Sequence, residues 1–457
     1  GALPIRPPIP GIEASNLWFL RTVDDAVTLR AFLESRHPQY AVVIGAGFIG
    51  LEVVEALLRQ HLSVTLVEMA PQVLPPLDGE MAAVVATALR KEGVELVLGD
   101  GIAAFEGEQE ANGVVLQSGR RIRGDLFVAG LGVRSNVALA KEAGLRLGSK
   151  GGIWVDAQMR TSDPEIFAAG DAVEGLERVT AEPALFALAG PANKQGRIAG
   201  ENAAGGNLNY HGALGTAIVR SGSVVAAITG ISQRRAETMG IPYQVNYIVT
   251  PHHAAYYPGG KEILIKLLWS PNDGRVLGAQ IVGGSGVDKR IDVLATAIWN
   301  GMTIDGLADL DLAYAPPFSS AKDPVILAGM AASNRQRGFV DGIIPEELDT
   351  LLTVAHRLQL VDVRDPQEFQ SGIIAGAINL PLDQLREQLE QLDPNADTVV
   401  FCRSGQRSYQ AERILVQHGF RHVRNLSGGY LAWSAYITSK SDRAPLAKAY
   451  LQEEFLR

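Results

Sequence analysis

The sequence lacks three features that would point to particular classes of protein. It contains one cysteine, Cys402, so a disulfide within the chain is impossible, and a cytoplasmic location is predicted because an unpaired thiol persists in a reducing compartment. No apolar run approaches the roughly 20 residues that a membrane helix needs. Positive charge is not in excess either, because the net charge is -9, which disfavours nucleic acid and acidic membranes as partners. Small molecules are the expected partners.

The secondary-structure signals divide the chain into α/β parts. Strands at 40–44 and 63–68 flank a glycine-rich loop and an Ala/Leu-rich helix, and further alternation to about residue 135 predicts a doubly wound sheet. Residues 213–325 have β-branched runs separated by turns, which predict a hairpin-rich α+β unit. After a polar connector, the segments from Leu360 onwards predict a separate small α/β domain.

A glycine-rich loop between a strand and a helix marks the first candidate site. The loop contains Gly45, Gly47, Phe48, Ile49 and Gly50. Its glycines permit a tight turn, a close approach to a pyrophosphate and close helix packing, while the helix N-terminus donates N–H groups to phosphate. Glu68 ends the next strand, where its carboxylate can accept from both ribose hydroxyls and repel a 2′-phosphate. We therefore predict NADH over NADPH, the alternatives being glycines that only close-pack the helix and a solvated strand-end acid.

Several segments together resemble the pyridine-nucleotide flavoprotein disulfide reductases. They are the glycine loop, the run 130–136 that contains Gly132, and the segment 161–171 that ends in Gly170 and Asp171. The segments 188–197 and 311–317 narrow the likeness to the coenzyme A-disulfide reductase and NADH oxidase branch.

The resemblance implies a flavin site beside the nicotinamide site. Asp171, at the end of a short apolar strand expected over 166–171, would contact the ribityl or pyrophosphate part of FAD. The helix that begins near Pro191, just after Ala189, would direct its positive end at the flavin pyrimidine ring. An ordinary turn acid and an ordinary capped helix are the alternatives.

The same resemblance implies a first glycine-rich βαβ unit and a redox cysteine ahead of Gly1, where this sequence starts. Neither occurs in the sequence, and Cys402 lies in the wrong domain to replace that cysteine. We therefore expect an N-terminally truncated chain with an incomplete reductase half that binds FAD weakly or not at all.

Residues 213–325 resemble the dimerisation domain of the same family, which implies a homodimer. Tyr256 and Tyr314 match positions where coenzyme A-disulfide reductases place tyrosines near the thiol substrate, and a tyrosine hydroxyl can donate a hydrogen bond or a proton to a leaving thiolate. Tyr257 fits better as an interface aromatic, which is also the alternative for the other two. His252 and His253 lack a third ligand at metal spacing, so no metal site is predicted.

Four C-terminal segments, 361–369, 376–381, 402–408 and 428–433, resemble a rhodanese domain. Cys402 ends a buried strand on a loop that leads into a helix N-terminus, which predicts an exposed thiolate with a depressed pKa, and Arg403 and Arg407 add positive potential. Such a thiolate can accept a sulfane sulfur and hold it as a persulfide. A buried structural cysteine and a cysteine phosphatase are the alternatives, although the phosphatase cradle closes with arginine one residue later. Ile373 stands where the family often has histidine.

The two resemblances predict a FAD-dependent, NADH-using reductase of coenzyme A-type disulfides or persulfides, fused to a sulfurtransferase. An NADH oxidase or peroxidase is the second hypothesis, and a non-redox nucleotide-binding scaffold that carries an active sulfurtransferase is the third.

The expected fold class is α/β, with a doubly wound Rossmann-like NAD domain within a partial FAD domain, an α+β dimerisation domain and an α/β rhodanese domain. The expected boundaries are a connector and helix of the partial FAD domain at 1–36, the NAD(H)-binding domain at 37–136, the C-terminal part of the FAD domain at 137–210, the dimerisation domain at 211–330, a linker at 331–347, the rhodanese domain at 348–440 and a tail at 441–457.

Overall fold

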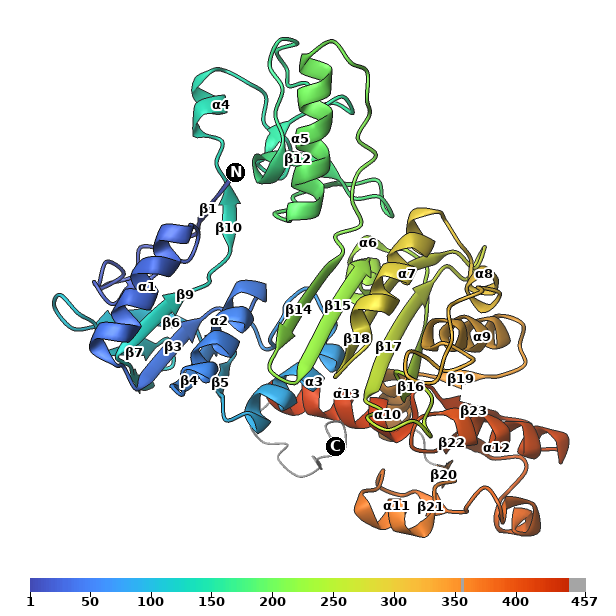
Figure 1. The fold of residues 1–457 in the computed structure, drawn as a ribbon. Coiled ribbons are helices and arrows are strands. Elements are labelled where there is room, and N and C mark those ends of the chain that lie inside the picture. Colours follow the sequence, from blue (N-terminus) through green and yellow to red (C-terminus); the bar gives the residue numbers. More distant parts are fainter. Residues whose placement is uncertain (355–356, 444–457) are drawn as a thin grey trace. The chain divides into compact units, whose positions relative to one another are not determined.

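The computed structural model describes residues 1–354 and 357–443 and divides into two compact units (Figure 1). Unit 1 consists of Gly1–Pro75 and Leu89–Gly222, and unit 2 consists of Pro76–Ala88 and the described residues from Ser223 onwards. None of the helices in the described ranges has the length and apolar character needed to span a membrane.

A five-stranded parallel sheet of order β2-β9-β3-β4-β5 organises the first part of unit 1. Its central strand β3 places four consecutive buried residues between its neighbours, as expected where both faces of a parallel sheet are covered. The Rossmann-like sheet predicted from the sequence is thereby confirmed. Helix α1 begins after Thr22, which forms a capping box with Asp25. The elements are β2 (Leu17–Trp18), α1 (Val23–Arg36), β3 (Tyr40–Ile44), α2 (Phe48–Arg59), β4 (Ser63–Glu68), β5 (Glu95–Leu98) and β9 (Leu126–Ala129).

The remaining elements of unit 1 form small sheets and short helices. The strand expected over 166–171 is wrong, because that stretch makes only an isolated bridge between Arg160 and Phe167 and then turns into η1 at Gly170, whose φ of +81° ends any extended run. Residues 1–36 also differ from expectation, since β2 joins the parallel sheet. The elements are β1 (Ala2–Pro4), β6 (Ile102–Glu106), β7 (Gly113–Leu116), β8 (Arg121–Arg123), β10 (Val133–Ser135), α4 (Ala138–Glu142), β11 (Ile153–Trp154), η1 (Gly170–Ala172), β12 (Val173–Leu176), β13 (Pro183–Ala184), α5 (Ala189–Ala203) and β14 (Ala217–Ser221).

An antiparallel sheet with strands in the order β15-β18-β17-β16 forms the first part of unit 2. Strands β17 and β18 form a hairpin, as the hairpin-rich pattern of this part of the sequence predicts. Helix α7 packs on β15 and β18, and α9 packs on β16. The predicted α+β unit is confirmed. The elements are α3 (Gly79–Lys91), which lies mostly in unit 2, β15 (Val224–Gly230), α6 (Gln233–Met239), β16 (Gln244–Pro251), β17 (Glu262–Trp269), β18 (Val276–Gly283), α7 (Val287–Trp299), α8 (Ile304–Ala308) and α9 (Pro324–Gln336).

A buried ion network fastens the segment 76–88 to this sheet. Lys266 on β17 is 1% exposed, and its Nζ lies 2.8 Å from Asp78 Oδ2 and 2.5 Å from Glu80 Oε1. The Tyr247 hydroxyl donates to Glu80 at 2.9 Å, and the Gln280 amide donates to Asp78 at 2.6 Å. Burial acts to raise the pKa of Asp78, but the Lys266 ammonium outweighs it and the pKa is lowered. The segment expected in the NAD(H)-binding domain therefore belongs structurally to unit 2.

A second parallel sheet, of order β19-β23-β22-β20-β21, forms the C-terminal part of unit 2 and confirms the separate small α/β domain. Alternate residues of β22 enter two different cores, with Val400 on one face and Val399 on the other. Helix α13 reaches Arg443, beyond the expected boundary at 440, and the rest of the predicted tail lies outside the described residues. The elements are β19 (Gly342–Ile343), α10 (Pro345–Val354), β20 (Leu358–Asp362), α11 (Pro366–Ser371), β21 (Ile378–Asn379), η2 (Leu385–Glu387), η3 (Leu389–Gln391), β22 (Asp397–Phe401), α12 (Gln406–Gln417), β23 (Val423–Leu426) and α13 (Gly429–Arg443).

Candidate functional site

The three glycines of the nucleotide loop meet three different environments. Gly45 has a φ of +98°, and a Cβ there would lie 2.3 Å from the Gly130 carbonyl oxygen. A Cβ at Gly50 would lie 1.9 Å from the Gly45 carbonyl oxygen, whereas one at Gly47 would have no described neighbour within 4 Å. Gly45 and Gly50 therefore serve the turn and the packing of α2 on the sheet. Gly47 leaves room for a ligand to approach the backbone, so the loop suits a pyrophosphate.

The start of α2 and the end of β4 complete this nucleotide loop. Gly47 is the N-cap of α2 and supplies no side-chain cap, so the first N–H groups of the helix, around Phe48 and Ile49, are suited to phosphate oxygens. The Glu68 carboxylate accepts from the Ala46 N–H at 2.7 Å and the Ala70 N–H at 2.8 Å. The Glu68 carboxylate is therefore hydrogen-bonded to the glycine loop through Ala46 and is not a freely solvated acid. Each of its oxygens keeps further lone pairs for ribose hydroxyls.

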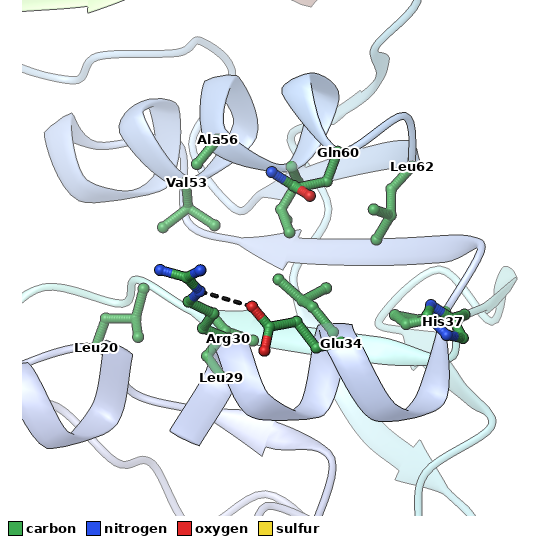
Figure 2. A pocket seen from close by; sticks show the side chains of 12 residues that line it. Leu20, Leu29, Arg30, Glu34, His37, Val53, Ala56, Gln60 and Leu62 are labelled. Carbon is green, nitrogen blue, oxygen red and sulfur yellow. Dashed lines mark hydrogen bonds and ion pairs between the residues drawn. The ribbon is translucent and has the colours of Figure 1, made fainter. Parts of the chain in front are cut away.

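A cavity of about 720 Å³ lies between α1 and α2, and Figure 2 shows side chains that line it. Its walls are mainly apolar, with Val53 and Leu57 of α2 facing Leu29 of α1, and Arg30 pairs with Glu34 at 2.8 Å beside them. None of the residues predicted for a site lines it. This cavity is therefore distinct from the nucleotide loop at the start of α2.

The residues predicted for the flavin lie together in unit 1. Asp171 sits in η1, which packs against α5, and its carboxylate lies 3.4 Å from the Arg21 guanidinium. The Gly170 N–H donates to the Gln195 side chain of α5 at 2.8 Å, and the Ser135 hydroxyl donates to the Asp171 carbonyl at 2.7 Å. Sequence reasoning missed Arg21 and Gln195, and no local pattern distinguishes either of them.

Helix α5 begins at Ala189, so Pro191 lies in its first turn as predicted. Its N-cap, Leu188, has no side-chain oxygen with which to cap the first N–H groups. An uncapped helix N-terminus beside a half-buried acid fits an isoalloxazine-bearing dinucleotide, because the helix end favours negative charge. Gly132 has a φ of +90° just after β9, a backbone conformation that favours glycine.

The structure brings together the two tyrosines predicted for thiol chemistry. The Tyr256 and Tyr314 hydroxyls lie 3.2 Å apart, and both side chains are exposed. The hydrogen bond between the two hydroxyls raises the pKa of Tyr314, so Tyr314 stays protonated at neutral pH. Tyr257 instead stacks edge-on against His253. The pair can therefore donate a proton, and Tyr257 is not part of it.

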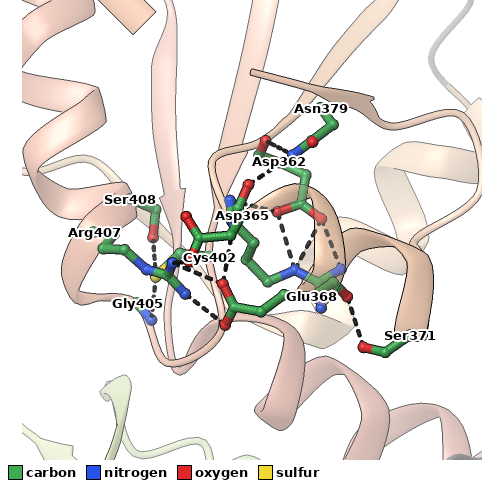
Figure 3. A network of polar contacts seen from close by, with 10 residues as sticks. Asp362, Asp365, Glu368, Ser371, Asn379, Cys402, Gly405, Arg407 and Ser408 are labelled. Atoms are coloured by element: carbon green, nitrogen blue, oxygen red, sulfur yellow. Dashed lines mark hydrogen bonds and ion pairs between the residues drawn. The ribbon is translucent and has the colours of Figure 1, made fainter. Parts of the chain in front are cut away.

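Cys402 follows β22 and lies in the cradle shown in Figure 3. Its Sγ accepts from the Gly405 N–H at 3.1 Å and from the Ser408 hydroxyl at 3.5 Å. Gly405, with a φ of +97°, is the N-cap of α12, so the sulfur lies at the N-terminus of a helix. The expectation of an exposed thiolate is wrong, because Cys402 is 1% exposed and packs in the same core as Val400.

The two arginines predicted beside Cys402 have different partners. Both terminal nitrogens of Arg407 contact Glu368 at 2.7 Å, and Nη1 lies 3.3 Å from Asp365. Burial acts to raise the pKa of Glu368, but its bond to Arg407 outweighs burial and lowers it. The Arg403 guanidinium is bound by Glu262 of β17, with Nη2 and Oε2 2.8 Å apart. Arg407 interacts electrostatically with Cys402, while Arg403 is directed to a strand outside the C-terminal domain.

A buried ion pair that sequence reasoning missed completes the cradle. Arg364 and Asp362 form a two-point contact, with distances of 2.9 and 2.7 Å to Asp362 Oδ2. Arg364 also donates to the Gly372 carbonyl at 2.5 Å and lies 4.3 Å from the Tyr430 ring centre. Burial raises the pKa of Asp362, although Arg364 opposes that shift.

Sequence reasoning also missed Glu368, although a signal for it exists. Its spacing from Asp365 is the capping-box pattern at the start of α11, which can be found in the sequence.

These features define a class of protein. A Rossmann-like sheet with an open glycine loop, an acid beside an uncapped helix, an antiparallel α+β unit and a cysteine in an N–H cradle together describe a dinucleotide-dependent flavoprotein reductase joined to a sulfur-carrying domain.

Comparison with known families agrees. Residues 1–187 match the pyridine nucleotide-disulphide oxidoreductases, residues 219–325 match the dimerisation domain of the same family, and residues 345–436 match the rhodanese-like domain. The chain belongs to the pyridine nucleotide-disulphide oxidoreductases and carries a C-terminal rhodanese-like domain. The family resemblance and the fold class predicted from the sequence are thus confirmed. The cofactors of this family are FAD and NADH, as predicted.

Individual relatives are similar over most of their length. The NADH oxidase of Methanocaldococcus jannaschii is 37% identical over 72% of this chain and 73% of its own. The structure of reduced Bacillus anthracis CoADR-RHD is 43% identical, with a TM-score of 0.92 over 97% of this chain and 78% of its own. The structure of a NAD-dependent persulfide reductase from A. fulgidus is 40% identical, with a TM-score of 0.88 over 95% of this chain and 78% of its own.

Proposed function

We propose that this protein is an NADH-dependent flavoprotein that reduces disulfides or persulfides of coenzyme A-type thiols, and that its rhodanese-like domain carries sulfur on Cys402. The observation that carries the proposal is the cradle, in which the Gly405 N–H and the Ser408 hydroxyl both point at a sulfur at the N-terminus of α12. When bound, FAD supplies the electron transfer between a nicotinamide and a disulfide. The N-terminus of α5, which lies beside Asp171, would favour the negative charge on the pyrimidine ring of a reduced flavin.

The sulfur step needs only groups that this chain provides. The Cys402 thiolate attacks the sulfane sulfur of a persulfide R–S–SH, the S–S bond breaks, R–S⁻ leaves, and Cys402 becomes a persulfide. The Gly405 N–H and the Ser408 hydroxyl contact the Cys402 sulfur before this step and would hold the persulfide after it. In the reductase part, the Tyr256 and Tyr314 pair would donate a proton to the departing thiolate of the substrate.

The two tyrosines lie in the dimerisation domain and are exposed. Exposed aromatic residues in such a domain support a homodimer, in which these side chains would meet the partner subunit. A reducing cytoplasmic location would keep the single thiol of Cys402 available for this chemistry.

Replacing Cys402 by serine tests the sulfurtransferase part. Because Cys402 is the nucleophile, the substitution should reduce loading of sulfur onto the protein at least about 1,000-fold. Loading is measured as the mass gain of one sulfur atom on the intact protein after exposure to the persulfide of coenzyme A. Wild-type protein stripped with a thiol reductant is the control for the unloaded mass. Undiminished loading of C402S would contradict the proposal.

The oxidase hypothesis remains the principal competitor, because one relative is called an NADH oxidase. Oxygen uptake and persulfide reduction, measured on the same NADH-supplied protein, separate the two activities. A persulfide reductase should consume NADH faster with persulfide in the absence of oxygen than with oxygen alone.

Nucleotide choice is the next expected result. Glu68 is bound to the loop at Ala46 and Ala70, so its negative charge is held where a 2′-phosphate would lie, and NADH should bind more tightly than NADPH. Glu68→Gln removes the charge and should raise the affinity for NADPH relative to NADH by roughly tenfold. Calorimetric titration of both nucleotides gives the ratio, with E52Q on the exposed face of α2 as a matched control. Tighter binding of NADPH by the wild type would overturn this assignment.

A further inference from the structure

Every arginine of the Cys402 cradle is bound by at least one carboxylate. Figure 3 shows Glu368 and Asp365 both contacting the Arg407 guanidinium, close to Cys402. Among the described ion pairs here, three arginines meet four carboxylates. The pairs are Arg364 with Asp362, Arg403 with Glu262, and Arg407 with both Asp365 and Glu368. The cradle therefore holds no excess positive charge in its side chains.

One of these carboxylates comes from outside the rhodanese-like domain. Glu262 begins β17, and its bond to Arg403 belongs to a wider contact between this domain and the antiparallel sheet of unit 2. The Tyr247 N–H donates to the Ser427 hydroxyl at 2.8 Å, and a Cβ on Gly428 would lie 2.7 Å from Tyr247 Cβ. The loop beside Cys402 is thus held against β16 and β17, and its Arg403 is neutralised there.

We propose that Glu262 and Glu368 determine which sulfur donor Cys402 accepts, favouring persulfides of thiols over inorganic dianions such as thiosulfate. The inference rests on the proposed role of Cys402 as the sulfur carrier. Attack by a thiolate on thiosulfate gathers three negative charges at one site, so that reaction needs uncompensated cations nearby. A persulfide brings at most one negative charge to the reacting sulfurs. Paired arginines therefore discriminate against thiosulfate far more than against a persulfide.

The two donors differ in what leaves. With thiosulfate, the Cys402 thiolate attacks the outer sulfur, the S–S bond breaks, and sulfite departs with the bonding electron pair. With a persulfide, the same bond breaks and a thiolate departs, which water protonates. Both reactions place one sulfur on Cys402 and need no external oxidant or reductant. The chemistry is otherwise matched, so the charge around the cradle decides between the donors.

Removing one carboxylate at a time tests this inference. Glu368→Gln removes one of the two carboxylates on Arg407 and leaves Asp365 at 3.3 Å, while the new side chain can still accept the Asp365 N–H of the capping box. Glu262→Gln removes the carboxylate that binds Arg403. Single-turnover loading of Cys402 is followed by intact mass, using the full-length protein with thiosulfate and, separately, with the persulfide of coenzyme A. Each variant should raise the thiosulfate rate by about tenfold relative to the persulfide rate. E390Q removes an exposed carboxylate from the same domain and should leave the ratio unchanged.

The outcomes are distinguishable. A wild type that loads from the persulfide but poorly from thiosulfate, with the ratio shifted in E368Q and E262Q but not in E390Q, supports the inference. Equal loading of the wild type from both donors, or an unchanged ratio in both variants, overturns it and leaves the sulfur-carrier role intact. Failure of the wild type to load from either donor would instead remove the proposed function on which the inference rests. Circular dichroism of each variant confirms that the ratio is measured on folded protein.

Discussion

Replacing Lys266 by methionine is expected to lower the free energy of unfolding by about 3–5 kcal/mol. The substitution leaves Asp78 and Glu80 facing one another in the interior without the ammonium that lies between them at 2.8 and 2.5 Å. Removing one partner of a buried ion network is costly because the remaining charge has neither water nor a counterion. Urea denaturation followed by circular dichroism measures the effect on unit 2.

A matched control separates the network from the loss of any lysine. Lys322 is exposed, so K322M should change the stability by no more than about 0.5 kcal/mol. Adding D78N and E80Q to K266M removes the uncompensated charges and should restore much of the loss. If K266M were no less stable than K322M, the network would contribute nothing to folding.

Alanine at Gly47 and alanine at Gly50 are expected to have opposite consequences. A Cβ at Gly47 has free space in the protein but occupies the approach to the pyrophosphate, so G47A should fold normally and bind NADH at least about tenfold more weakly, a change of 1.4 kcal/mol. A Cβ at Gly50 would lie 1.9 Å from the Gly45 carbonyl oxygen. G50A must therefore separate α2 from the sheet, and its thermal midpoint should fall.

Two measurements on G47A and on G50A test this expectation. Calorimetric titration gives the affinity for NADH, and a thermal melt gives the stability. G93A supplies a control for adding a methyl group, although its φ of +88° adds backbone strain of its own. A G47A protein that binds NADH as tightly as the wild type would contradict the assignment of this loop to the pyrophosphate. Reduced binding by G47A accompanied by an equal loss of stability would show that Gly47 serves packing instead.

The nucleotide loop was predictable because its determinants are local. Gly45, Gly47, Gly50 and Glu68 lie within one strand–helix–strand unit, and the physical role of each follows from that arrangement. The loop that contacts the Cys402 sulfur was likewise visible in the consecutive residues 402–408, although the Asp362–Arg364 pair was not. Tyr256 and Tyr314 were paired only through a family resemblance, since 58 residues separate them.

What sequence reasoning missed depends on distant partners. Glu262 lies 141 residues from Arg403, and Lys266 lies 186 residues from Glu80, so no periodicity or motif connects them. The burial of Cys402 was missed because the loop chemistry suggested access, whereas the alternation of β22 directs this side chain into the core. The turn at Gly170 was missed because the four apolar or small residues before it are typical of a strand.

The contact between Arg403 and Glu262 means that the charged groups around Cys402 extend beyond the border of the rhodanese-like segment in the sequence. A fragment cut near Pro345 would keep the cysteine, its loop and most of both cores, yet it would lose the carboxylate on β17. Moving this segment alone into another protein would therefore transfer the fold without the Glu262 carboxylate that binds Arg403. A sulfur-transfer domain that is moved to another protein should therefore be moved together with β17, which carries Glu262.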